Sequence, residues 1–141
     1  MLTKKILLVY LILIFLISPV LTISVFSQEE SCPVWHKDWS YRQSIILPIP
    51  TDDPFAKHQP IDLHIDFENP CWAINENEHS IRVCVWNGNK WYEIESQIYD
   101  LKFEDQYHIS SCGLVFLVPD IADGKEEYFV HYDNNMKPAT N

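Results

Sequence analysis

Apolar and polar residues alternate with a period of two in the part of the chain that follows residue 30. Between residues 61 and 67 every second residue is apolar, and Asp62, His64 and Asp66 occupy the positions between them. Such alternation is typical of a β-strand with one buried and one solvated face. No stretch has the period of an amphipathic helix. The pattern predicts strands at residues 41–49, 61–67, 80–86, 91–99, 114–118 and 127–133.

The spacing and punctuation of these strands predict the fold class. Asn87 and Gly88 lie between two β-rich runs, which is a strong hairpin signal because both residue types tolerate positive φ. Pro48 and Pro50 indicate that the first strand ends at a sheet edge. Short strands separated by Pro, Asn and Asp are typical of antiparallel sandwiches. We therefore expect an all-β fold, an antiparallel β-sandwich of the jelly-roll or immunoglobulin-like kind.

An uncharged apolar run at residues 6–26 predicts the compartment. Two lysines precede the run and a small-residue exit follows it, which is the pattern of a secretory signal cleaved after Ser27. The run is also close to the roughly 20 residues that cross a bilayer, so an uncleaved anchor is the alternative. We expect residues 1–27 to be a signal peptide or signal anchor. Residues 28–141 are then a single β-sandwich domain, secreted or held at the cell surface.

The charge of the chain restricts its partners. The chain has 20 acidic and 10 basic residues and a formal net charge of −10. Such a surface repels phosphate backbones and anionic lipid headgroups, which argues against nucleic acid and membrane-surface binding. Glycans and other cell-surface proteins are the remaining candidate partners, and only an uncleaved N-terminal segment would enter the membrane. A role in solubility alone explains the charge equally well.

All four cysteines follow the apolar run, and the oxidising conditions outside the cytoplasm favour disulfides. Four cysteines allow three pairings. Cys71 closely follows one strand pattern and Cys112 closely precedes another. A Cys71–Cys112 bridge is therefore favoured if the two strands are antiparallel neighbours, and Cys32–Cys84 follows by elimination. No two cysteines have the close spacing of zinc ligands, which argues against a zinc site.

Two acidic residues on one predicted strand could perform sugar hydrolysis. Glu93 and Glu95 share a strand face about 7 Å apart, a separation found in glycosidase carboxylate pairs. Alternating acids are equally typical of a solvated strand. The sequence has no Gly-x-Ser-x-Gly elbow, and its three glycines form no phosphate loop. We therefore predict no catalytic residue, no cofactor and no enzyme activity.

Two further groups of residues could bind cations. Asp62, His64 and Asp66 share one strand face, and His131 and Asp133 form a similar pair on another strand. A metal site draws its ligands from several segments, whereas this spacing is that of any exposed strand. We predict no metal site.

The tryptophans could form a surface on which a sugar ring stacks. Trp86 and Trp91 flank the predicted hairpin, and Trp39 belongs to the segment before the first strand. We take these three as the candidate ligand-binding residues. Cross-strand and core packing explain their positions without a ligand.

The chain resembles an uncharacterised domain family of archaeal and bacterial exported surface proteins that begins with Trp-x-Tyr-Arg. Residues 39–42 read Trp-Ser-Tyr-Arg, and the resemblance continues through residues 80–85, 91–94 and 127–133. It covers residues 35–133. The resemblance implies a β-sandwich loosely similar to concanavalin-type lectin folds, carried on larger surface proteins, and it implies no established activity. The four cysteines depart from the family's usual pattern.

We expect a non-catalytic, extracellular structural or adhesive module of a cell-surface protein. The alternatives are a carbohydrate-binding domain and a glycosidase fragment. A structural module buries its tryptophans, a binding module presents two or three coplanar on one surface, and an enzyme holds Glu93 and Glu95 in a cleft. The chain ends soon after its last predicted strand, so it is either a small complete protein or the N-terminal module of a longer one.

Overall fold

The computed structural model describes residues 32–138, which contain seven β-strands joined by turns and loops. No helix in this part is long and apolar enough to cross a membrane. The signal peptide or anchor predicted for residues 1–27 lies outside the described residues. The strands are β1 Tyr41–Ile45, β2 Pro60–Trp72, β3 Ile81–Trp86, β4 Trp91–Ile94, β5 Ser96–Phe103, β6 His108–Leu117 and β7 Glu127–Tyr132.

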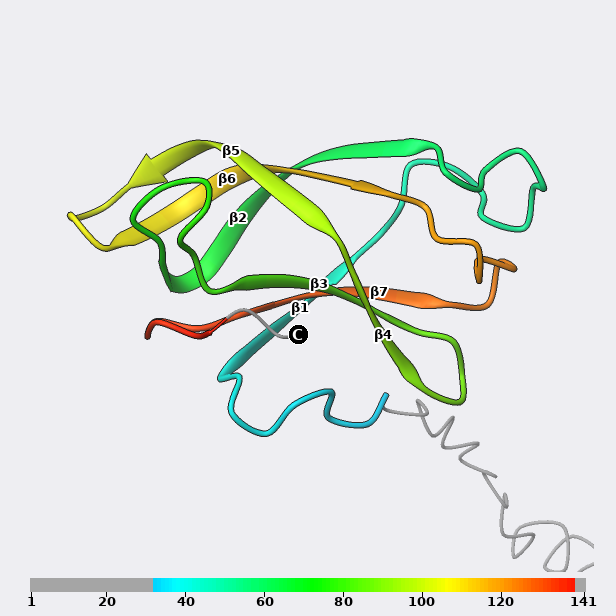
Figure 1. The fold of residues 1–141 in the computed structure, drawn as a ribbon, viewed down its shortest axis with the longest axis horizontal. Helices are drawn as coiled ribbons and strands as arrows, with labels where there is room; N and C mark the ends of the chain where they lie inside the picture. The colour runs from blue at the N-terminus through cyan, green and yellow to red at the C-terminus, as the bar shows by residue number, and fades with distance from the viewer. Residues whose placement is uncertain (1–31, 139–141) are drawn as a thin grey trace, which may run out of the picture. The chain divides into compact units, whose positions relative to one another are not determined.

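The strands form two antiparallel sheets. Sheet A has the order β1-β7-β3-β4, and sheet B has the order β2-β6-β5. Figure 1 shows the two sheets as separate layers, with β5, β6 and β2 in one and β1, β7, β3 and β4 in the other. The all-β, antiparallel, two-sheet architecture predicted from the alternation is confirmed.

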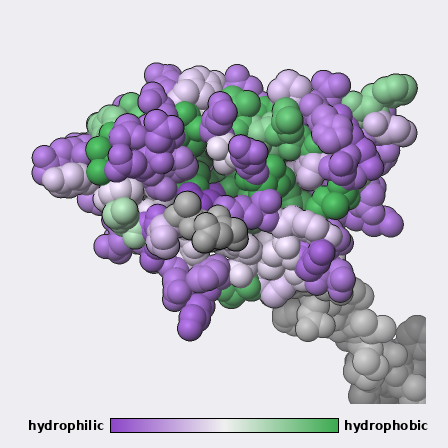
Figure 2. Space-filling model, viewed as in Figure 1, coloured by the Kyte–Doolittle hydropathy of each residue, from purple (hydrophilic) through white to green (hydrophobic). Residues whose placement is uncertain are grey.

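The inward positions of both sheets supply the core. On β3 these are the fully buried Val83 and Val85, and on β6 they include Leu114 and Phe116. Burying an apolar side chain of this size stabilises the fold by roughly 1.5 to 3 kcal/mol. Figure 2, in the same view, shows apolar side chains gathered in the band between the two layers.

The strand boundaries differ from the predicted ones in two places. The strand predicted for residues 91–99 is two strands, because the chain leaves sheet A after Ile94 and enters sheet B at Ser96. The strand predicted for residues 41–49 ends at Ile45, ahead of Pro48 and Pro50. Its predicted position at a sheet edge is confirmed, since β1 is the first strand of sheet A.

The predicted hairpin is present between β3 and β4. Trp86 pairs with Trp91, and Gly88 has a φ of 87°, in the left-handed region that glycine adopts without strain. The side-chain oxygen of Asn87 accepts hydrogen bonds from the backbone N–H groups of Asn89 and Lys90, at 3.0 and 2.9 Å. These bonds close the turn.

Candidate functional site

Four tryptophans lie on the outer face of sheet A, where they pack against one another at an angle. The ring centroids of Trp86 and Trp91 are 5.4 Å apart, and the ring planes are tilted by 52°. Those of Trp35 and Trp39 are 5.5 Å apart with a tilt of 50°. A sugar-stacking surface built from several rings needs them coplanar. The structure therefore places the predicted ligand residues Trp39, Trp86 and Trp91 together on one face but not as a flat platform.

Residues 32–40, which we call the strap, run across this face. The indole Nε1 of Trp91 donates a hydrogen bond of 3.1 Å to the carbonyl of Pro33. The guanidinium of Arg42 donates one of 3.1 Å to the carbonyl of Cys32. These bonds join the strap to β4 and β1, the two edge strands of sheet A. The strap thus partly buries the outer face of sheet A, which we call the clad face.

Both arginines of the chain stack on aromatic rings of this face. The guanidinium carbon of Arg42 lies 4.9 Å from the ring centroid of Phe129, and that of Arg82 lies 5.4 Å from the ring of Trp39. Each such contact is worth about 0.5 to 2 kcal/mol, depending on burial. Arg82 Nε also lies 3.3 Å from a carboxylate oxygen of Glu93. Glu93, a predicted candidate acid, is therefore an ion-pair partner on the clad face.

His131 lies at the centre of the clad face. It pairs with Arg42 on β1 and with Arg82 on β3, and its side chain is 96 % buried, since only 4 % is exposed. Its ring centroid lies 4.9 Å from that of Trp35 and 5.6 Å from that of Trp91. Burial, assisted by the nearby charge of Arg42, lowers the pKa of His131 to about 4. The imidazole is therefore neutral at pH 7.

Asp133, the predicted partner of His131, instead fastens the end of the strap. Its carboxylate accepts hydrogen bonds from the backbone N–H and the hydroxyl of Ser40, at 3.0 and 2.7 Å. Asn135 and Lys137 also bind it. Burial alone would raise the pKa of Asp133, but these bonds outweigh burial and hold it at about 2. Within residues 32–138 no group of three His, Cys, Asp or Glu side chains could hold a metal ion.

Glu95 follows the end of β4, where the chain passes from sheet A to sheet B. It lines a cavity of about 390 Å³ whose other lining residues include Phe116, Val118 and His58 but not Glu93. The structure therefore does not bring the two predicted carboxylates together in this cavity. Nothing in their arrangement favours the glycosidase alternative.

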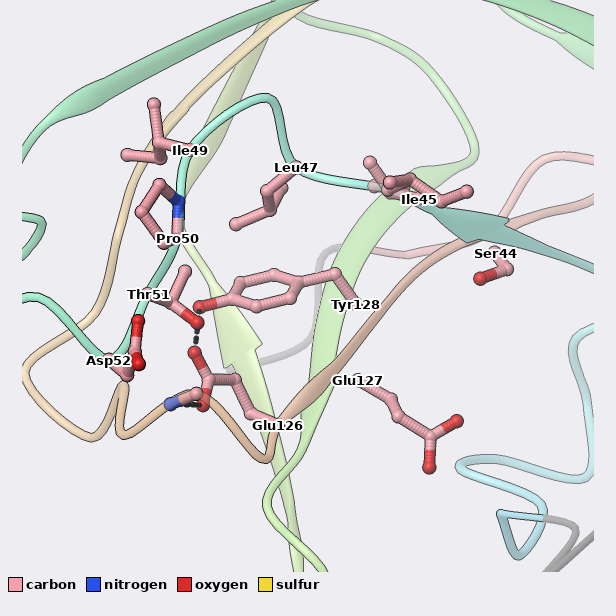
Figure 3. A pocket seen from close by; sticks show the side chains of 12 residues that line it. Ser44, Ile45, Leu47, Ile49, Pro50, Thr51, Asp52, Glu126, Glu127 and Tyr128 are labelled. Atoms are coloured by element: carbon pink, nitrogen blue, oxygen red, sulfur yellow. Dashed lines mark hydrogen bonds between the residues drawn. The ribbon is translucent and has the colours of Figure 1, made fainter.

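A second cavity, of about 470 Å³, lies beside the end of β1 (Figure 3). The carboxylate of Glu126 forms part of its wall and accepts hydrogen bonds from the backbone N–H groups of residues 123–125 and from the hydroxyl of Tyr128. Burial would raise the pKa of Glu126, but the hydroxyl of Thr51 and these donors hold it at about 2. This carboxylate is occupied in joining two loops, which limits its use for a ligand.

Within residues 32–138 no segment covers the outer face of sheet B as the strap covers sheet A, and we call this outer face the open face. Residues opposite one another in an antiparallel ladder point to the same side of the sheet. The carboxylates and imidazole predicted to share a face on β2 do so here, and His64 lies 3.5 Å from Asp66 with both side chains more than half exposed. Three rows cross the open face, namely Asp62-Val115-Gln97, His64-Gly113-Tyr99 and Asp66-Ser111-Lys102.

An exposed tyrosine ring lies at the middle of the open face, and the sequence analysis missed it. A Cβ added to Gly113 would lie 2.4 to 2.7 Å from three atoms of the Tyr99 ring, so the ring covers the glycine backbone directly. The phenol of Tyr99 donates a hydrogen bond of 2.6 Å to Asp62, and the residue remains 44 % exposed. The signal in the sequence was Gly113, because a glycine inside a strand often marks a close approach.

Neither predicted disulfide is present in the structure, where all four cysteines are buried free thiols. Cys71 and Cys112 lie on neighbouring strands, as expected, but Cys71 is opposite Ile109 and Cys112 is opposite Ile65. These two thiols belong to the core between the sheets, whereas Cys84 alternates with core residues and faces the clad side. The pairing stays a prediction, which peptide mapping of the exported protein without reductant will test.

Comparisons with protein-family models, curated proteins and solved structures found no match to this chain. The geometry of its two outer faces is therefore the basis on which we propose a function.

Proposed function

We propose that the exported part of this chain is a non-catalytic structural or adhesive module on the outside of the cell, a β-sandwich of the jelly-roll or immunoglobulin-like kind. The difference between the two outer faces carries the proposal. On sheet A the strap and four tryptophans pack over the face, and the indole N–H of Trp91 donates to the carbonyl of Pro33. On sheet B polar and aromatic side chains are exposed.

This asymmetry suits a module that is held through one side and presents the other. The strap is the segment through which the N-terminal run connects to the domain, and its attachment to both edge strands of sheet A would spread any pull over the sheet. The open face of sheet B then remains available to a partner. Its carboxylates, imidazole, amide and phenol can all form hydrogen bonds, as recognition surfaces require.

Bead adhesion tests this proposal. The full chain, solubilised in detergent and coupled to beads, is incubated with cell envelopes isolated from the producing organism. We expect saturable retention that is lost when the open face is altered by Asp62→Lys and Asp66→Lys together. The control is Asp38→Lys, a single charge reversal on the exposed part of the strap, which should retain binding. Absence of retention by the folded protein, or equal loss in both variants, would overturn an adhesive role.

A further inference from the structure

We propose that the open face binds a neutral glycan, with the ring of Tyr99 as the surface on which one pyranose unit stacks. This inference rests on the proposed function and names the class of ligand. Four features of the open face carry it: the orientation of the tyrosine, its fixation, the polar groups around it and the charge of the domain.

The orientation of Tyr99 follows from its contact with Gly113. The two residues are directly opposite each other on β5 and β6, and three atoms at the phenol end of the ring lie within 2.7 Å of where a glycine Cβ would be. Only a ring lying across the strand can approach the glycine backbone this closely. One side of the ring therefore covers β6, and the other side contributes to the 44 % exposure of the residue.

The ring is fixed before any ligand arrives. Its hydroxyl donates to Asp62 on β2 at 2.6 Å, so the side chain of Tyr99 spans all three strands of sheet B. Holding a side chain in its binding position removes the entropy loss that ordering it would otherwise cost. A pyranose presents an apolar face of C–H groups, which matches an aromatic ring held in this way.

Polar side chains surround the ring within the neighbouring rows. Asp62 has lone pairs left for further donors beyond the phenol, since a carboxylate accepts about four hydrogen bonds. Gln97 and His64 flank the tyrosine in the register of the sheet, and Asp66 and Lys102 occupy the next row. These groups offer both donors and acceptors to sugar hydroxyls. His64, Asp66 and Tyr99 are all exposed, which suits a chain of sugars better than a small enclosed ligand.

The charge of the protein selects among glycans. The whole chain has a formal net charge of −10, and with two carboxylates on the open face itself the protein repels uronic acid and sulfated polymers. Neutral hexoses and N-acetylated amino sugars are not repelled. A single stacking ring gives weak binding for one copy, so several copies on a surface would act together.

The test measures the binding of three defined hexasaccharides to the full chain in a detergent without a sugar headgroup. Cellohexaose and chitohexaose are the neutral probes, and hexagalacturonate is the anionic one. We expect saturable binding of at least one neutral probe and none of the anionic probe. Tyr99→Leu keeps an apolar cover over Gly113 but removes the ring, and it should weaken binding about tenfold or more.

Two controls separate recognition from a purely structural tyrosine. Tyr107→Leu removes a tyrosine of similar exposure, 47 %, outside the open face and should bind as the unchanged protein does. Tyr99→Phe keeps the ring and should lose only about threefold. Equal affinity of Tyr99→Leu and the unchanged protein, or no saturable binding of either neutral probe by folded protein, would overturn the inference. Envelope adhesion that persists without glycan binding would refute the glycan alone, whereas loss of both would refute the proposed function as well.

Discussion

The outer faces of both sheets carry outward-pointing polar and aromatic side chains, but those of sheet A are largely covered and those of sheet B are exposed. Sheet A places Arg42, His131 and Arg82 in one row, and the strap with its tryptophans covers them. Sheet B places His64, Gly113 and Tyr99 in the corresponding central row, where the tyrosine ring covers the glycine and remains exposed. Alternation along a strand therefore determines which side chains point outward. Whether those side chains are exposed to solvent depends on a segment outside the sheet, here the strap.

The largest expected effect comes from breaking the clad face at Trp91. This ring contacts Trp86, Phe129 and His131, and its N–H holds the strap. Trp91→Ala should lower the free energy of unfolding by about 3 kcal/mol, measured by urea denaturation. The exposed Tyr107→Ala is the aromatic control and should change it by less than about 0.5 kcal/mol. Similar losses in the two variants would show that the clad face is not specially stabilising.

The next effect is on the pH dependence of the free energy of unfolding, to which the buried His131 of the clad face contributes. The pKa of His131 is about 4 in the folded protein and about 6.5 in the unfolded chain, so the unfolded state binds more protons between these values. Its contribution is complete above pH 6.5 and decreases as the pH falls to 4, by about 3 kcal/mol. His79, whose pKa burial and Arg82 also lower to about 4, adds to the same slope.

Unfolding measured from pH 7.5 to pH 4 checks this prediction. The ring-conserving His131→Phe should flatten the slope by about half, because only His79 then remains of the two. An unaltered slope in His131→Phe would contradict the burial argument. Below about pH 4 the protonation of Asp133 and Glu126, both with pKa values of about 2, should destabilise the fold further.

A smaller effect is expected from adding a single methyl group under the tyrosine. Gly113→Ala places a Cβ 2.4 Å from two Tyr99 ring atoms, so the ring must move off β6. We expect a loss of about 1 kcal/mol in the free energy of unfolding together with loss of glycan binding. Ser111→Ala, on the same strand, is the control for binding and should keep the glycan affinity, because Ser111 is buried at 3 % exposure. Retained binding in Gly113→Ala would mean that the ring position is unimportant.

The smallest effect tests the bond that fixes the ring. Tyr99→Phe removes the hydrogen bond to Asp62 on an exposed surface, and should cost about 0.5 kcal/mol of unfolding free energy. Asp62→Asn, which still offers an oxygen acceptor, should cost less. A loss above about 2 kcal/mol in Tyr99→Phe would indicate a structural role larger than the open face suggests.

The sequence predicts the layers of this fold better than its surfaces. The alternation at residues 61–67 and the Asn87-Gly88 turn depend on neighbouring residues, and both are found as expected. The predicted 91–99 strand is divided at Glu95 because the chain passes there from one sheet to the other. No nearby Gly or Pro indicates this change of sheet. Local pattern therefore identified the β-rich segments but not the point at which one sheet ends.

The candidate site shows the same limit. Trp39, Trp86 and Trp91 are predicted ligand residues because an indole face matches a sugar ring, but Trp39 packs against Trp35, Trp86 packs against Trp91, and the strap binds the N–H of Trp91. The sequence does not predict the position of the Tyr99 ring, because its partner Gly113 is 14 positions away in the chain. The two residues meet only across the β5–β6 ladder. A glycine next to an apolar strand was the one local sign of it.

Residue-level mapping of glycan binding tests the central claim most directly. Backbone amide shifts of the isotopically labelled full chain are followed by NMR during titration with cellohexaose and, separately, chitohexaose. The account predicts saturable shifts that cluster on β5 and β6 around Tyr99 and Gly113, with β3, β4 and the strap unchanged. Shifts centred on Trp86 and Trp91, or none in either titration of the folded protein, would contradict it.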